Sequence, residues 1–330
     1  MDVIEAAAPD LMEFYLQHGR LPHITDEIKP WDYRGWLLPY VIQLHGSPFF
    51  GKGRTPEHTE PAAITKGKPT RDWAAYARGQ CPDRWGYYLR TLEAGQLLEE
   101  SIPRLDFRGE FDSASAGGRK AIEQAELVIE RGHDSWSSFH TLVDWLYWAC
   151  GLTKEEPKVD DQLNEDLYRT FNVEPLLLDP SDHLGSYLAE RKGTGWNPTA
   201  FFPTPHHVVE MMVRMQMQHD GRDARALTVV DPCVGTGRML LHASNYSLRL
   251  YGQDIDGLVV KITRLNGVLY APWLAFGMPE GFFGETNQND TKLISPPPDV
   301  PVAIEPARLR PADLTINRAG QQGLLFGMED

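Results

Sequence analysis

The sequence is poor in cysteine, with only Cys81, Cys150 and Cys233 among its 330 residues. These three lie far apart and show no paired spacing. A disulfide framework uses an even set of cysteines, and a zinc site uses cysteines or histidines at short intervals. The cysteine content therefore argues against both, and we expect no metal site.

The sequence also lacks an apolar run of the roughly 20 residues that a membrane-spanning helix needs. Its N-terminus carries no signal-peptide pattern. We therefore expect a cytoplasmic protein without a membrane partner. The length is sufficient for two domains with a sizeable core.

Positive charge is in deficit, because 32 Lys and Arg residues face 46 Asp and Glu residues, which gives a net charge of −14. Such a balance does not favour non-specific binding to the phosphate backbone of DNA. A protein of this composition that acts on DNA needs a local basic patch or a more basic partner. Residues 45–69, rich in glycine, proline and basic side chains, are the best candidate patch, although such segments are more often ordinary solvated loops.

The pattern of the first 195 residues predicts a helical domain. Apolar spacing predicts helices at residues 2–18, 71–101 (interrupted near Pro82), 119–131, 136–150 and 161–171. Aromatic residues concentrate in segments 30–44 and 136–150. Core packing explains such clusters more simply than a surface on which nucleic-acid bases stack.

From residue 227 the pattern changes to that of a doubly wound sheet. Residues 227–230 form a β-branched apolar run that is typical of a buried parallel strand. Residues 238–248 have helical spacing, and residues 249–253 predict a second strand. A glycine turn precedes the helix, and acidic residues follow the second strand. This order is that of the first half of a nucleotide-binding fold.

The glycine turn indicates what kind of ligand it would accept. It is not the dinucleotide fingerprint G-x-G-x-x-G, because the chain from Asp231 to Gly237 is D-P-C-V-G-T-G. Without β-carbons at Gly235 and Gly237, a ligand can lie against the backbone. The Asp231 carboxylate, just before the turn, suits a cationic ligand. A lone glycine turn is more often part of some other α/β protein, but the neighbouring motifs decide against that alternative.

Residues 231–237 resemble motif I of S-adenosylmethionine (AdoMet)-dependent methyltransferases, in the D-P-x-x-G-x-G form common among DNA adenine-N6 methyltransferases. Residues 180–298 resemble that family more broadly, especially the modification subunits of type I restriction-modification systems and related phage enzymes. Residues 184–187, L-G-S-Y, look like its L-G-x-x-Y-E helix, and Asn266 matches a helical asparagine pattern. The resemblance implies an α/β fold: a helical N-terminal domain followed by a partial doubly wound, Rossmann-like methyltransferase domain.

The resemblance also implies which residues bind AdoMet. Residues 202–205, F-P-T-P, look like motif X, usually F-Y-T-P, whose threonine touches the methionine part of AdoMet. Asp254 is similar to the motif II acid that holds the ribose, and Ile255 would pack on the adenine ring. Glu285 lies where the motif III acid would bind the adenine amino group. The implied cofactor-binding residues are Phe202, Thr204, Pro205, Asp231, Pro232, Gly235, Gly237, Asp254, Ile255 and Glu285.

The sequence departs from the family at motif IV, where Asn, Asp or Ser precedes Pro-Pro and an aromatic residue. Here the run is Ser295-Pro296-Pro297-Pro298. The resemblance makes Ser295, Pro296 and Pro297 catalytic, as acceptors of hydrogen bonds from the amino group of a flipped-out adenine. Pro298 cannot stack on that base, which costs about 1–3 kcal/mol. The run fits the start of a proline-rich linker equally well, so both interpretations stay open.

The segment after motif IV is short. A complete methyltransferase sheet needs three more strands, and a DNA methyltransferase usually has a target-recognition region as well. Residues 299–320, rich in proline and polar side chains, instead predict an extended linker. We therefore expect the catalytic half to be truncated or supplied elsewhere, for example by a second subunit that completes the fold.

The C-terminal tail carries one more motif. Residues 322–326, Q-G-L-L-F, resemble the bacterial sliding-clamp-binding pentapeptide Q-x-x-L-F. A glutamine anchor beside leucine and phenylalanine is a compact plug for a hydrophobic pocket. The implied partner-binding residues are Gln322, Leu325 and Phe326. The alternative is that this apolar tip folds back onto its own domain.

These observations predict three parts: a helical domain over residues 1–195, an AdoMet-binding domain over 196–298 and a tail over 299–330. The resemblance implies a site-specific, adenine-specific DNA methyltransferase that transfers a methyl group from AdoMet to adenine N6. The alternative is a catalytically inactive relative that acts as a structural or regulatory subunit in DNA processing. The order of the motifs argues against RNA or protein as the methyl acceptor.

Overall fold

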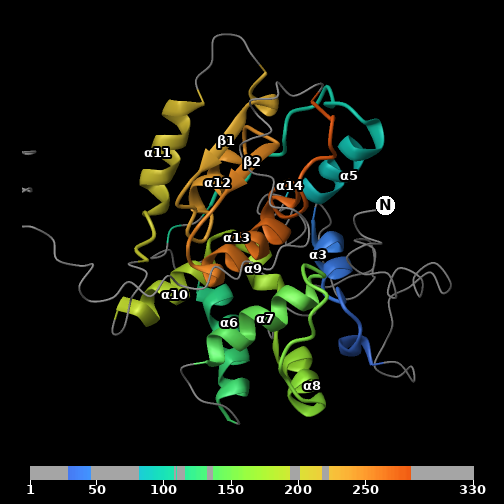
Figure 1. Cartoon of the computed structure of the whole chain (residues 1–330), viewed down its shortest axis with the longest axis vertical. Coiled ribbons are helices and arrows are strands. Elements are labelled where there is room, and N and C mark those ends of the chain that lie inside the picture. Colours follow the sequence, from blue (N-terminus) through green and yellow to red (C-terminus); the bar gives the residue numbers. More distant parts are fainter. Residues whose placement is uncertain are drawn as a thin grey trace, which may run out of the picture. The chain divides into compact units, whose positions relative to one another are not determined.

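The computed structural model describes residues 29–45, 82–107, 109, 116–131, 137–193, 201–217 and 223–283. Over these residues the chain is mostly helical and contains a small parallel sheet of two strands (Figure 1). This combination is compatible with the predicted α/β class. No described helix is both long and apolar enough to cross a membrane.

Every regular element in the described chain before residue 195 is a helix. These helices are η1 (Pro30–Asp32), α3 (Leu38–Leu44), α5 (Arg84–Ala94), α6 (Ala116–Glu130), α7 (Ser138–Ala149), α8 (Asp161–Thr170), α9 (Glu174–Leu178) and α10 (His183–Gly193). The strands lie among the later elements, which are α11 (His206–Gln216), η4 (Ala224–Ala226), β1 (Thr228–Asp231), α12 (Arg238–Ala243), β2 (Arg249–Gly252), α13 (Gly257–Tyr270) and α14 (Pro272–Phe276).

Local signals set several of the helix ends. Asp83 accepts a hydrogen bond from Gly86 N at 2.7 Å where α5 begins, and Asp160 accepts one from Leu163 N at 2.8 Å where α8 begins. A carboxylate in this position satisfies an N–H group that has no partner inside the helix. α5 ends at Gly95, whose φ of 62° is left-handed.

Aromatic residues form part of the core between the N-terminal helices. Trp36, in the turn before α3, contacts Trp145 of α7 and Tyr168 of α8, with ring centroids 5.6 and 4.7 Å apart. Trp145 is fully buried and donates from Nε1 to Asn164 Oδ1 at 2.8 Å. Tilted and edge-on pairs of this kind stabilise a core beyond the burial of their area. The prediction that the aromatic residues of segments 30–44 and 136–150 are core residues is confirmed for Trp36 and Trp145, whereas Trp136 lies outside the described residues.

β1, α12 and β2 form a βαβ unit (Figure 1). The strands pair in parallel, with Val229 opposite Leu250 and Asp231 opposite Gly252. Parallel strands need a crossover connection, and α12 supplies it while contacting both strands. Because both strands end at the same edge of the sheet, the residues that follow them meet there.

Two predicted helices are shorter in the structure. The helix predicted over residues 238–248 ends at Ala243, because the chain turns toward β2 and Ser247 Oγ bonds to Leu227 O at 2.5 Å, beside the start of β1. The described part of the helix predicted over 71–101 ends at Ala94, where Gly95 turns left-handed. In both places a turn overrides the apolar periodicity.

Packing across residue 195 is continuous. Trp85 of α5 donates from Nε1 to Val268 O of α13 at 2.8 Å, and the Tyr270 hydroxyl of α13 donates to Leu176 O of α9 at 2.7 Å. One hydrophobic cluster therefore includes the N-terminal helices and the βαβ unit. The predicted domain boundaries after residues 195 and 298 stay predictions.

We expect Gly95→Ala to destabilise the protein by about 1–2 kcal/mol, the cost of a left-handed backbone for an L-residue. An added Cβ meets nothing within 4 Å there, so the strained backbone conformation is the only source of the expected loss of stability. Gly257→Ala is the matched control, because its Cβ also enters open space but its φ is not left-handed. Urea unfolding at neutral pH measures both, and equal losses would contradict this account of the α5 end.

Candidate functional site

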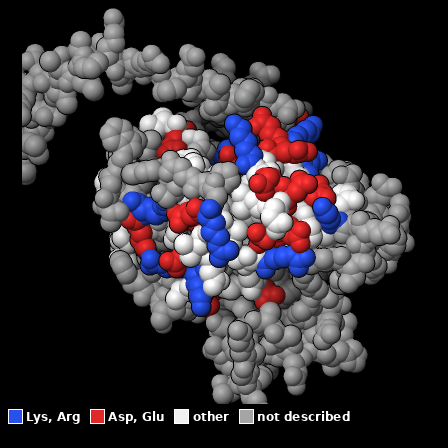
Figure 2. All heavy atoms as spheres, turned by 90° about the horizontal axis from the view of Figure 1, so that it is seen from below, with Lys and Arg blue, Asp and Glu red and all other residues white. Residues whose placement is uncertain are grey.

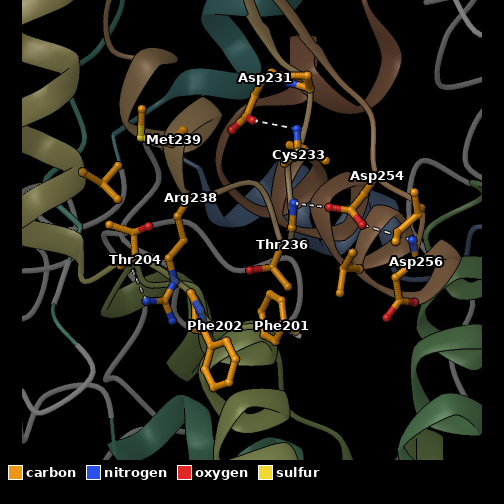
Figure 3. Close-up of a pocket in the computed structure, with 17 residues that line it drawn as sticks. Phe201, Phe202, Thr204, Asp231, Cys233, Thr236, Arg238, Met239, Asp254 and Asp256 are labelled. Carbon is orange, nitrogen blue, oxygen red and sulfur yellow. Dashed lines mark hydrogen bonds between the residues drawn. The ribbon is translucent and has the colours of Figure 1, made fainter. Parts of the chain in front are cut away.

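A cavity of about 310 Å³ lies where β1 and β2 end. Three separate segments contribute to its lining: residues 201–209 at the start of α11, residues 231–239 through the glycine turn, and residues 254–259 after β2 (Figure 3). In open α/β sheets, ligands bind at this edge. The cavity is therefore the candidate functional site.

The glycine turn takes a shape that only glycine adopts easily. Gly235 and Gly237 have φ values of 54° and 88°, both left-handed. A Cβ at Gly237 would lie 2.9 Å from Thr263 Cγ2, and one at Gly235 would lie 3.3 Å from the Phe201 ring. The backbone of the turn therefore packs closely against α13 on one side and Phe201 on the other.

Three aspartates line the pocket, and each is held by a backbone N–H group. The Asp254 carboxylate accepts from Gly235 N at 2.9 Å and from Asp256 N at 3.0 Å, and that of Asp231 accepts from Cys233 N at 3.1 Å (Figure 3). The Asp256 carboxylate accepts from Leu258 N at 3.0 Å. Burial raises the pKa of the Asp231 carboxyl, and the charge of Asp254 raises it as well. A cationic ligand would relieve this repulsion. Among the described residues, no group of three or more His, Cys, Asp or Glu side chains could hold a metal ion.

Large apolar side chains are open to solvent in the same pocket. Phe202 is 78% exposed and Ile255 is 86% exposed, although both line the cavity. Exposed apolar surface in a pocket is typical of a ligand contact. Together with the aspartates, it suits a ligand that carries both a positive charge and a planar ring.

A fully buried carboxylate, Asp182, adjoins the pocket wall just before α10. Its Oδ2 accepts from Thr236 Oγ1 at 2.5 Å and from Arg238 Nε at 2.7 Å. Its Oδ1 accepts from Asn266 Nδ2 at 2.8 Å and from Gly185 N at 2.9 Å. Burial by itself raises the pKa of Asp182, but the Arg238 charge and the hydrogen bonds hold that pKa below its usual value. Asp182 is therefore charged in the folded protein.

A buried histidine pair connects the two helices next to the pocket. His206 Nδ1, at the start of α11, lies 3.0 Å from His242 Nε2 of α12. Burial and the nearby charge of Arg238 lower the pKa of His206 and lower that of His242 to about 4. Both rings are therefore neutral at neutral pH, and one donates the hydrogen bond that the other accepts.

The structure brings most of the predicted cofactor residues together. Those that line the cavity are Phe202, Thr204, Asp231, Pro232, Gly235, Asp254 and Ile255. Pro205 and Gly237 adjoin the cavity at the starts of α11 and α12. The remaining predicted residues lie outside the described residues, namely Glu285, Ser295, Pro296, Pro297, Gln322, Leu325 and Phe326.

Sequence pattern alone did not single out four residues at or beside this site. Phe201, Arg238 and Asp256 line the cavity, and Asp182 holds Arg238. Asp256 had a weak signal as an acid that follows the second strand. Asp182 has only the signal of a helix N-cap, since nothing local to residue 182 indicates that it is buried against the glycine turn.

Fold and site together define a class: a βαβ unit with an acid-lined pocket at its strand ends, as in proteins that bind nucleotide-like ligands. The family model described as N-6 DNA Methylase matches residues 186–271. These residues include both strands and every segment that lines the cavity, so the match supports the N6 DNA methyltransferase family and a DNA methyltransferase-like function. No curated protein and no solved structure matches the chain.

We expect the histidine pair to make the protein sensitive to acid. Unfolded histidine takes up a proton below about pH 6.5, whereas the buried pair stays neutral to lower pH. The unfolded state therefore gains protons first, and the free energy of unfolding falls as pH drops from 7 to 5, by up to about 1.4 kcal/mol per pH unit for each histidine.

Urea unfolding at several pH values tests this expectation. The double substitution His206→Gln with His242→Gln is expected to flatten the dependence, although other buried histidines such as His45 leave part of it in place. His140→Gln, at an exposed position, is the control and is expected to keep the full slope. An unchanged slope in the double variant would show that the pair does not titrate as described.

Proposed function

We propose that this chain is a DNA adenine-N6 methyltransferase-like protein that binds AdoMet in the pocket. The observation that carries the proposal is the convergence of three motif-bearing segments on one cavity of about 310 Å³. In this proposal residues 196–298 form a partial Rossmann-like methyltransferase domain, which follows a helical domain over residues 1–195. Residues 299–330 form the tail.

The chemistry of the lining supports AdoMet as the ligand. Asp231 offers a carboxylate to its ammonium group, and Asp254 can accept hydrogen bonds from the ribose hydroxyls. Ile255 offers an exposed apolar face to the adenine ring. Phe202 and Thr204 contact the methionine part. Pro232 and Gly235 shape the turn against which the ligand lies. Pro205 and Gly237 are the N-cap residues of α11 and α12 and so fix where these helices begin beside the pocket. Glu285, which lies outside the described residues, accepts a hydrogen bond from the adenine amino group in this proposal. When bound, AdoMet supplies a methyl group activated by a sulfonium.

The catalytic part of the proposal rests on three residues outside the described chain. Ser295, with the carbonyls of Pro296 and Pro297, accepts hydrogen bonds from the amino group of a flipped-out adenine. This orients the nitrogen lone pair toward the methyl group. The amino group attacks directly, so the chain acts by positioning rather than through a covalent intermediate.

The charge pattern favours a partner in DNA binding. Figure 2 shows a face of the molecule on which basic and acidic side chains are interspersed. Ion pairs such as Arg119 with Glu190 at 2.7 Å, and Arg169 with Glu165 at 2.6 Å, offset described basic side chains. Phosphate binding needs cations that are not already paired. We therefore propose a second subunit that completes the fold and supplies such contacts, as the resemblance to type I modification subunits and phage enzymes implies.

A second candidate function is that of a catalytically inactive relative, which binds AdoMet but acts as a structural or regulatory subunit in DNA processing. The run Ser295-Pro296-Pro297-Pro298 favours it, because it lacks the aromatic residue that stacks on the target base. A sheet of two strands in the described chain is also consistent with this alternative.

We expect the full-length protein to bind AdoMet in a calorimetric titration and to transfer tritiated methyl groups from it to mixed-sequence DNA. Asp254→Ala is expected to raise the Kd for AdoMet about ten-fold or more, because it removes the acceptor for the ribose hydroxyls. Hydrogen bonds to a charged group are worth about 1.5–3 kcal/mol each.

Asp223→Ala is the matched control, because Asp223 is an exposed aspartate outside the pocket. Its Kd for AdoMet is expected to equal that of the wild type. Binding with methyl transfer supports the enzyme, and binding without transfer supports the inactive relative. A wild-type protein that does not bind AdoMet contradicts both functions.

We also propose that Gln322, Leu325 and Phe326 bind a sliding clamp. The double substitution Gln322→Ala with Phe326→Ala is expected to abolish retention of the protein on immobilised clamp, since it removes both the anchor and the plug. Gln321→Ala, one residue outside the pentapeptide, is the control and is expected to keep retention. A double variant that is retained like the wild type would end this part of the proposal.

A further inference from the structure

One guanidinium connects two separate walls of the pocket. Arg238 lines the cavity at the end of the glycine turn, and its Nη1 donates to Thr204 O, on the opposing segment, at 3.0 Å (Figure 3). Its Nε donates to Asp182 at 2.7 Å, and its Nη2 donates to Ser186 Oγ of α10 at 2.9 Å. The orientation of Arg238 is therefore set from α10, and Arg238 in turn holds the segment that contains Thr204.

The glycine turn is attached to the same carboxylate by two further routes. Thr236 Oγ1 donates to Asp182 directly at 2.5 Å. Asn266 Nδ2 of α13 donates both to Asp182 at 2.8 Å and to Thr236 O at 2.9 Å. The network is buried, because Asp182, Arg238 and Asn266 are 0%, 4% and 1% exposed. Hydrogen bonds to charged groups are stronger and more directional in such surroundings.

From this network we infer that Asp182, which does not line the pocket, is a positioning residue for the cofactor, acting through Arg238 and Thr236. The inference rests on the proposed function, because it concerns the AdoMet pocket. It makes the start of α10 part of the cofactor site. It also assigns Arg238 a role that the motif-like residues around it do not indicate, namely keeping Thr204 at a fixed distance from the glycine turn.

Arg238→Lys tests the connection without removing the charge that Asp182 needs. Lysine offers one nitrogen where arginine offers three, so it can pair with Asp182 but cannot also hold Thr204 O and Ser186 Oγ. The Kd of the full-length variant for AdoMet is expected to rise about ten-fold. Calorimetric titration is done at a temperature at which circular dichroism shows each variant to be folded, so a loss of stability alone would leave the Kd unchanged.

Arg119→Lys is the matched control for this variant. It makes the same substitution at an exposed arginine of α6 that pairs with Glu190, outside both the pocket lining and the Asp182 network. It is expected to leave the Kd for AdoMet at the wild-type value. The two variants together separate the connection from Arg238 to Thr204 from any general effect of replacing an arginine with lysine.

A second pair of variants tests the positioning role of Asp182 if Arg238→Lys does not fold. Thr236→Val removes the hydroxyl that Asp182 accepts from and keeps the volume, so it is expected to raise the Kd for AdoMet. The separate variant Thr236→Ser keeps the hydroxyl and is expected to bind AdoMet with the wild-type Kd. Direct packing of the Thr236 methyl group on the ligand would give the opposite order.

The outcomes separate the two proposals. A wild type that binds AdoMet, together with weaker binding by Arg238→Lys and Thr236→Val, supports the positioning role. A wild type that binds AdoMet as tightly as both of these variants overturns the positioning role and leaves the proposed function standing. A wild type that does not bind AdoMet overturns both.

Discussion

The pocket depends on the buried ion pair between Asp182 and Arg238. Removing two charges from water is expensive, and the pair is tolerable only where other hydrogen bonds satisfy the remaining lone pairs and protons. Asp182 meets this condition with four donors, one each from α10, the glycine turn, α12 and α13. Because loss of either partner would leave an uncompensated buried charge, at a cost of about 3–5 kcal/mol, the pair selects a single arrangement of these four elements.

The groups that line the pocket and the groups that hold them come from different parts of the chain. The strand ends supply Asp231 and Asp254, whereas α10 and α13 supply the buried contacts that fix the turn between them. The histidine pair fastens α11 to α12 without adding charge beside the pocket. Because α10 holds the glycine turn through Asp182, the helices before the βαβ unit have to pack in the same core as that unit. For the same reason, the proposed AdoMet site depends on residues that precede the motif X segment, residues 202–205, in the sequence.

Much of the site was predictable because its requirements are local. Left-handed φ at Gly235 and Gly237 demands glycine, and the β-branched run of β1 is typical of a strand, so the turn and β1 are visible in the pattern. The prediction that this strand is buried was wrong, because its residues are half-buried or exposed and Val230 is 43% exposed. The end of α12 at Ala243 was not visible, because it depends on a hydrogen bond between Ser247 and a residue beside β1. The packing of Phe201 on Gly235 was equally hidden, because the resemblance to motif X indicated only the adjacent Phe202.

The sequence by itself determined the chemistry of this protein's pocket: acids after two strands, a glycine turn, and an aromatic-proline-threonine segment that resembles motif X. Those features are properties of neighbouring residues, and neighbouring residues are enough to specify turns, strands and charge. Only the tertiary structure decided that Asp182 would be buried against Thr236 and Arg238 rather than capping a helix in solvent. Burial and pairing of a charge depend on which elements pack together, and that is set by the whole core rather than by any one segment of the chain.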